Sequence, residues 1–123
     1  MTKYILIVDD EPDNIELFRM MLRSLNVEVR GAQLGSEALI RARQEPPLLI
    51  LLDLMLPDMT GFEVCAQLKA EPSTAQVHVA VLSGRSDEAA RKRALEAGAD
   101  HFLVKPVNRA DLKALVEAAL STA

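Results

Sequence analysis

The chain has 123 residues, half of them hydrophobic, with 14 basic and 18 acidic side chains and a formal net charge of −4. This length fits one domain with a real core, the apolar content argues against disorder, and the mildly acidic balance disfavours binding of nucleic acid by this domain alone. No apolar run approaches the roughly 20 residues of a membrane-spanning helix, and the single cysteine excludes an internal disulfide. We therefore expect one cytoplasmic domain over residues 1–123 that does not bind a membrane.

Short apolar runs alternate with helical patterns along the whole chain. The runs are continuously apolar, as in strands that are buried on both faces, and the helical patterns are bounded by proline, glycine and acidic residues. In chain order we predict a strand over 4–8, a helix opened by Pro12, a strand over 27–31, a helix over 36–43, a strand over 48–52, a helix over 62–70, a strand over 77–82, a helix over 86–97, a strand over 101–104 and a helix over 111–120.

Five strand-then-helix units predict an α/β fold with a five-stranded parallel sheet in the order 2-1-3-4-5, doubly wound by five helices as in flavodoxin. Open parallel sheets place their chemistry outside the carboxyl ends of the strands. Polar residues follow four of the apolar runs there, namely Asp9, Asp10, Asp53, Ser83 and Lys105. We expect these side chains to converge on one edge of the sheet.

This set of groups is suited to phosphoryl transfer onto an aspartate. Three carboxylates packed together repel one another, and a bound Mg²⁺ with all-oxygen ligands resolves the conflict. Asp53 could then act as a nucleophile that forms an acyl phosphate. Lys105 and Ser83 could bind phosphoryl oxygens. Each residue alone is explained as a strand end, helix cap, turn residue or surface lysine, but all five at the same ends of four runs favour the functional interpretation.

Four segments of the sequence resemble the receiver domain of two-component response regulators, and their order and spacing extend the resemblance over essentially the whole chain. They are IVDDE at 7–11, DLMLPDMTG at 53–61, VLSG at 81–84 and FLVKP at 102–106. The resemblance implies that Asp53 is the phosphoacceptor and that its donor is a phosphohistidine on a sensor histidine kinase or a histidine phosphotransfer protein. It also implies a Mg²⁺ site formed by Asp10, Asp53, the backbone carbonyl of Met55 and, through water, Asp9.

The resemblance assigns further roles near the end of the chain. Lys105 and Ser83 would contact the phosphoryl group, and Ser83 and Phe102 would form a switch pair that responds to it. The bond before Pro106 is a candidate for the cis isomer, which is accessible mainly at X-Pro bonds. By the same resemblance the domain is a phosphoacceptor with slow autodephosphorylation, and it is not an enzyme that acts on external substrates.

The predicted helix over 86–97 offers mainly alanines to the core, so its packing should be light. We therefore hypothesise that this helix, the strand over 101–104 and the last helix form an output face for an unknown downstream protein or output domain. The start at Met1 favours a free-standing protein or an N-terminal receiver.

Three other interpretations remain open from the sequence. A haloacid-dehalogenase-like phosphatase also uses an aspartate nucleophile, but it needs a second acid two residues later, where this chain has Met55. A flavodoxin needs a hydroxyl-rich phosphate loop after the first strand, where this chain has three acids at 9–11. A degenerate receiver that serves only as a docking module is disfavoured by the complete set of five polar groups.

Overall fold

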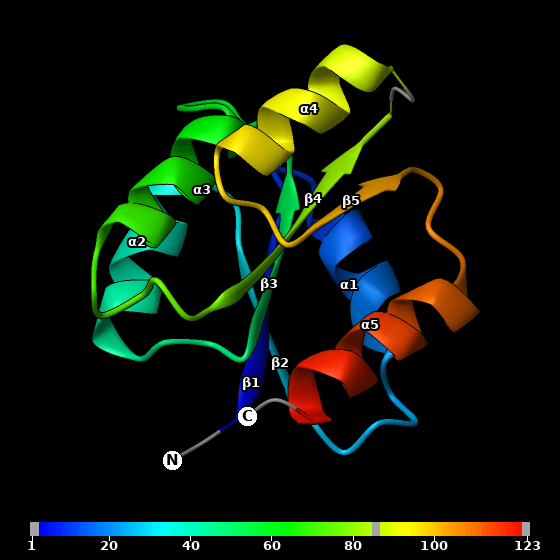
Figure 1. Ribbon diagram of the computed structural model, residues 1–123. Coiled ribbons are helices and arrows are strands. Elements are labelled where there is room, and N and C mark those ends of the chain that lie inside the picture. Colours follow the sequence, from blue (N-terminus) through cyan, green and yellow to red (C-terminus); the bar gives the residue numbers. More distant parts are fainter. Residues whose placement is uncertain (1–2, 85–86, 122–123) are drawn as a thin grey trace.

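The computed structural model describes residues 3–84 and 87–121. It confirms the predicted architecture, a parallel sheet in the order β2-β1-β3-β4-β5 with helices on both faces (Figure 1). The strands are β1 (Tyr4–Val8), β2 (Glu28–Ala32), β3 (Leu49–Asp53), β4 (His78–Ser83) and β5 (His101–Val104). The helices are α1 (Pro12–Met21), α2 (Gly35–Gln44), α3 (Gly61–Ala70), α4 (Glu88–Glu96) and α5 (Arg109–Ser121).

The central strands are apolar throughout because helices cover both of their faces. Side chains of β1 and β3 alternate between two cores, since successive residues of a strand point to opposite faces. Ile5, Ile7 and Leu51 pack with residues of α1 and α5. Leu6 and Leu52 pack with residues of α2, α3 and α4. Figure 1 shows the same division, with α2, α3 and α4 on one side of the sheet and α1 and α5 on the other.

The observed strand ends differ from the predicted ones in a way that matters for the site. β3 includes Asp53, which is in register with Leu82, and β4 includes Ser83, which is in register with Val104. The ladder continues one step further, since the N–H of Lys105 donates to the Ser83 carbonyl at 2.7 Å. These polar residues are therefore held by the sheet itself.

Four helices begin at different residues from those predicted, and for α2 and α3 the difference is one residue. α4 begins at Glu88, and the Asp87 side chain caps it by accepting a hydrogen bond from the N–H of Ala90 at 2.6 Å. The predicted start at Ser86 lies outside the described residues. α5 begins at Arg109, two residues early, because the Asn108 side chain accepts a bond from the N–H of Asp111 at 2.8 Å. Within the described ranges, none of the helices combines the length and apolar character needed to cross a lipid bilayer.

The turn after β3 folds back tightly onto the strand that precedes it. The N–H of Gly61 donates to the Leu54 carbonyl at 2.7 Å, and Met55 forms an isolated bridge with Thr60. A Cβ atom on Gly61 would lie only 2.8 Å from the backbone oxygen of Asp53. This close approach explains the glycine, and it holds the turn next to the carboxyl end of β3.

Candidate functional site

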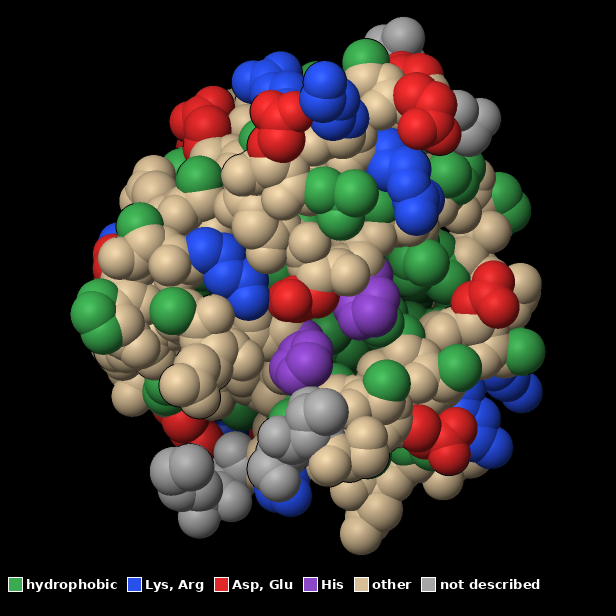
Figure 2. All heavy atoms as spheres, in the orientation of Figure 1, with side chains coloured by type: hydrophobic (Ala, Val, Ile, Leu, Met, Phe, Trp, Pro, Cys, Tyr) green, Lys and Arg blue, Asp and Glu red, His purple; other side chains and the backbone are tan. Residues whose placement is uncertain are grey.

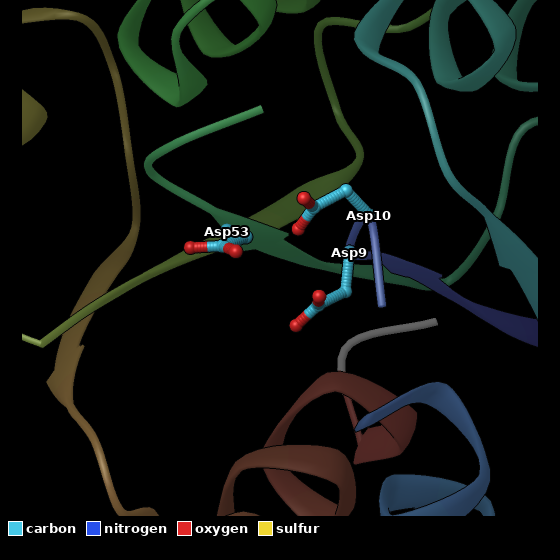
Figure 3. Close-up of side chains that lie close together, drawn as sticks. All are labelled: Asp9, Asp10 and Asp53. Atoms are coloured by element: carbon cyan, nitrogen blue, oxygen red, sulfur yellow. The ribbon is translucent and has the colours of Figure 1, made fainter. Parts of the chain in front are cut away.

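Three carboxylates meet at the carboxyl edge of the sheet, as the sequence predicts. Asp9 and Asp10 follow β1, and Asp53 ends the neighbouring strand β3. Figure 3 shows the three side chains directed toward a common space, and each offers one oxygen within 4.8 Å of the others. Asp9 is buried, Asp53 is half-buried and Asp10 is exposed. The cluster is thus open to solvent on the side of Asp10.

Asp9 is already bound within the chain. One carboxylate oxygen accepts the N–H of Glu11 at 2.9 Å, and the other accepts the side-chain amide of Asn14 at 3.2 Å. The second oxygen also lies 3.6 Å from Nζ of Lys105. These contacts engage both oxygens of Asp9 at the start of α1. Asn14 is a site residue that sequence reasoning missed, because the helix was placed from Pro12 and its apolar positions and no role was given to this polar residue.

Asp53 is a partly desolvated carboxylate beside one cation. Its side chain is 13% exposed, and Oδ1 lies 3.3 Å from Nζ of Lys105. The N–H of Met55 donates to the same oxygen at 3.4 Å. Burial raises the pKa of the Asp53 carboxyl, and the charge of Asp9 raises it further, while Lys105 and the Met55 N–H oppose this. An additional positive charge at the site would therefore lower the pKa of Asp53 and favour its ionised form.

The remaining predicted residues lie on β4, on β5 and just after β5. Lys105 contacts both Asp9 and Asp53, and its peptide bond to Pro106 is cis. Ser83 is buried at the end of β4, next to the strand of Asp53. Phe102, which is partly buried, packs against the core formed with α2, α3 and α4. Thus four strands bring the predicted polar groups to one edge.

The donor set fits a hard divalent cation. Among the described residues, Asp9, Asp10 and Asp53 are the one group of three or more acidic, histidine or cysteine side chains close enough to share an ion. All three offer carboxylate oxygens, the ligands that Mg²⁺ prefers, whereas nitrogen and sulfur ligands would favour Zn²⁺. With all three ionised, the Lys105 ammonium leaves two net negative charges at the site. A divalent cation would neutralise them.

A family model described as the response regulator receiver domain matches residues 5–117. The chain belongs to this family. The receiver domain is 37% identical over 123 residues to the phosphate regulon transcriptional regulatory protein PhoB of Rhizobium meliloti, an alignment that covers 100% of this chain and 54% of that protein. The chain spans about half the length, or less, of the curated relatives that it matches.

Solved structures agree with this assignment. A putative response regulator from Chloroflexus aurantiacus superposes on the receiver domain with a TM-score of 0.91 at 30% identity, over 98% of this chain and 99% of that one. The receiver domain of the sensor histidine kinase PA1611 from Pseudomonas aeruginosa, with a magnesium ion coordinated in its active site cleft, gives a TM-score of 0.88 at 28% identity, over 98% and 99% of the two chains. The domain is therefore a signalling domain of two-component systems.

Replacing Lys105 with methionine is expected to lower the free energy of unfolding by about 1–3 kcal/mol at pH 7, since it leaves buried acceptors of Asp9 and Asp53 without their cation. Loss of the cation raises the pKa of Asp53 further. A carboxyl with a raised folded-state pKa stabilises the fold below its unfolded pKa and loses that contribution as the pH rises through the folded value. The deficit should therefore shrink on acidification.

Urea unfolding at pH 7 and near the ordinary aspartate pKa measures this deficit. The matched control is Lys113→Met, which removes an exposed lysine of α5. An equal deficit at both pH values, or none at pH 7, would contradict the electrostatic role of Lys105.

Proposed function

We propose that the domain accepts a phosphoryl group on Asp53 from the phosphohistidine of a sensor histidine kinase or a histidine phosphotransfer protein, in a reaction that requires Mg²⁺. The observation that carries this proposal is the convergence of three carboxylates within 4.8 Å, with the Lys105 ammonium 3.3 Å from Asp53. Membership of the receiver family supports it. So does the magnesium ion that the related receiver of PA1611 coordinates in its active site cleft.

In the proposed reaction, a carboxylate oxygen of Asp53 attacks phosphorus and the bond from phosphorus to the histidine nitrogen breaks. The electron pair of that bond stays on the imidazole, and the product is an acyl phosphate on Asp53. Lys105 holds a phosphoryl oxygen as a point charge, and Ser83 donates a hydrogen bond to another. The same machinery accounts for slow autodephosphorylation, in which water replaces the aspartate as the group bonded to phosphorus.

Asp10, Asp53 and the Met55 carbonyl hold the metal directly in this proposal, and Asp9 contacts it through water. The engaged oxygens of Asp9 support its indirect role, because they already accept bonds from Glu11 and Asn14. Bound Mg²⁺ supplies charge neutralisation for the carboxylates and the incoming phosphoryl oxygens. Exposed Asp10 leaves the metal accessible from solvent.

Phosphorylation would act on the face formed by α4, β5 and α5 through Ser83 and Phe102. Among the described residues of α4, Ala94 alone is buried, and Figure 2 shows acidic and basic side chains gathered over this helix at the top of the view. Leu95 and Val104 are exposed on the same face. A lightly packed element can shift between two arrangements, and the bonds made by Ser83 bias that equilibrium.

The phosphatase alternative is less well supported by the site. The position two residues after Asp53 is Met55, which is exposed and has no acid to protonate a leaving group. The extent of the domain over residues 1–123 and its cytoplasmic location stay predictions. In the same proposal, the downstream target is a separate protein or an output domain.

Incubation with acetyl phosphate and Mg²⁺, followed by intact-mass analysis, tests the proposal. We expect one phosphoryl adduct, which a chelator prevents, and no turnover of a chromogenic phosphate ester. Amide exchange on the same sample should change between residues 83 and 107 if the output face responds. An unchanged mass would refute the phosphoacceptor assignment, and ester hydrolysis would favour the phosphatase.

A further inference from the structure

Asp58 lies in the turn after β3, but its side chain binds a different helix. One carboxylate oxygen accepts the N–H of Gly35 at 2.8 Å, and the other accepts the N–H of Ser36 at 2.9 Å. These are the first two residues of α2, and the N-cap residue Leu34 provides no side-chain hydrogen bond. Asp58 therefore caps α2, although it lies 22 and 23 residues away from Ser36 and Gly35 in the sequence.

The joint between the turn and α2 is closely packed as well as hydrogen-bonded. A Cβ atom on Gly35 would lie 2.5 Å from Cγ of Met59 and 2.9 Å from Cγ2 of Val64. The N–H groups of Ser36 and Gly35 also lower the pKa of the Asp58 carboxyl, so it is ionised at neutral pH. The turn and the start of α2 thus meet through two charge-assisted hydrogen bonds and through close packing of Gly35 against Met59.

The turn after β3 contains both Asp58 and Met55, so the contact of Asp58 with α2 also restrains the backbone of Met55. It is closed by the bond from the Gly61 N–H to the Leu54 carbonyl and by the bridge between Met55 and Thr60. Thr60 in turn caps α3 through the N–H of Glu63. Because the turn is closed at its base, the backbone of Met55 and the side chain of Asp58 belong to one small rigid unit.

We propose that Asp58 is a positioning residue for the magnesium site, which fixes the Met55 backbone by fastening the turn to α2. The inference rests on the proposed function, since it takes the Met55 carbonyl as a metal ligand. Asp58 does not belong to the acidic cluster, and both of its oxygens are engaged on α2. Its contribution to metal affinity is therefore indirect, like that of the outer partners that orient metal ligands.

Thermodynamic linkage gives the proposal a second consequence. If the joint strengthens Mg²⁺ binding by some factor, Mg²⁺ must strengthen the joint by the same factor. The amides of Gly35 and Ser36 should then exchange more slowly in the presence of Mg²⁺, although neither residue touches the ion. In Asp58→Ala this effect of Mg²⁺ should disappear.

Calorimetric titration with Mg²⁺ tests the inference on the full chain. We expect Asp58→Ala to raise the Kd about tenfold, at the lower end of the range for such outer partners. Asp58→Asn keeps one acceptor oxygen and should be intermediate. The matched control is Ala42→Gly, which destabilises α2 at a buried position without altering the turn, and should leave the Kd unchanged.

A titration at high ionic strength separates positioning from loss of one negative charge, and a phosphorylation assay then checks the effect on function. A through-space effect of the charge fades at high ionic strength, whereas a displaced backbone carbonyl does not recover. With acetyl phosphate, Asp58→Ala should need more Mg²⁺ for half-maximal phosphorylation and reach the same rate at saturation.

The inference fails if Asp58→Ala binds Mg²⁺ like the wild type, if its defect vanishes in high salt, or if Ala42→Gly shows an equal defect. A wild-type protein that binds no Mg²⁺ would instead refute the proposed function. The two failures are therefore distinguishable.

Discussion

Asp53→Asn is expected to abolish the phosphoryl adduct, so that no mass shift is detected with acetyl phosphate and Mg²⁺. An amide has almost the shape of the carboxylate, but it lacks the charged oxygen that attacks phosphorus. Intact-mass analysis measures the loss. The matched control is Glu117→Gln, which makes the same chemical change on the exposed side of α5 and should keep the adduct. An adduct that persists in Asp53→Asn would place the phosphoacceptor elsewhere.

The same substitution should not harm the fold, which keeps the result interpretable. Burial and the charge of Asp9 raise the pKa of Asp53, so its ionisation costs stability in the folded protein without metal. That cost is absent below the unfolded-state pKa of Asp53 and appears as the pH rises through the raised folded-state value. The free energy of unfolding of the wild type should therefore rise on acidification relative to that of Asp53→Asn. Urea unfolding at several pH values, from neutral to below the ordinary aspartate pKa, measures this difference.

Mg²⁺ should stabilise the wild type strongly, and Asp10→Asn should lose most of that gain. At a concentration one hundred times the Kd, a ligand of the folded state adds about 2.7 kcal/mol to the free energy of unfolding. For a domain of this size, such a gain raises the melting temperature by about 10 °C. Asp10 is exposed, so its replacement should cost less than about 0.5 kcal/mol by itself.

Thermal unfolding with and without Mg²⁺ measures this effect. The control is Asp13→Asn, which removes an exposed carboxylate of α1 outside the cluster and should keep the full rise. A rise in Asp10→Asn as large as in the wild type would show that the acidic cluster is not the metal site. Because the observable is stability, this outcome is independent of whether Asp53 is phosphorylated.

The sheet order and the convergence of the acidic residues could be predicted from the sequence because both follow from continuous apolar runs. A five-residue run such as 48–52, with prolines before it and turn residues after it, is typical of a strand covered on both faces. Parallel topology then determines the edge at which the polar groups after each run lie. The exact strand ends were missed. A hydrophobic pattern stops at the first polar residue, whereas the hydrogen-bond ladder continues through Asp53 and Ser83.

Asp58 and Asn14 could not be assigned from the sequence. Asp58 occurs among turn-forming residues, and its partners Gly35 and Ser36 are brought to it only by the tertiary fold. Asn14 is a polar residue in the first turn of a helix, where caps and solvent-exposed amides are common. Its bond to Asp9 becomes visible only when the end of β1 and the start of α1 are placed together.

The bond from the Lys105 N–H to the Ser83 carbonyl joins the two residues that are proposed to sense the phosphoryl group. Their main chains share one rung of the sheet, so a shift of one segment is coupled to a shift of the other. An activating displacement is therefore confined to two options: paired motion of both segments, or side-chain rotation over a fixed frame. If phosphorylation moves the main chain of either residue, this bond carries the other with it, so that part of the proposed response would be concerted.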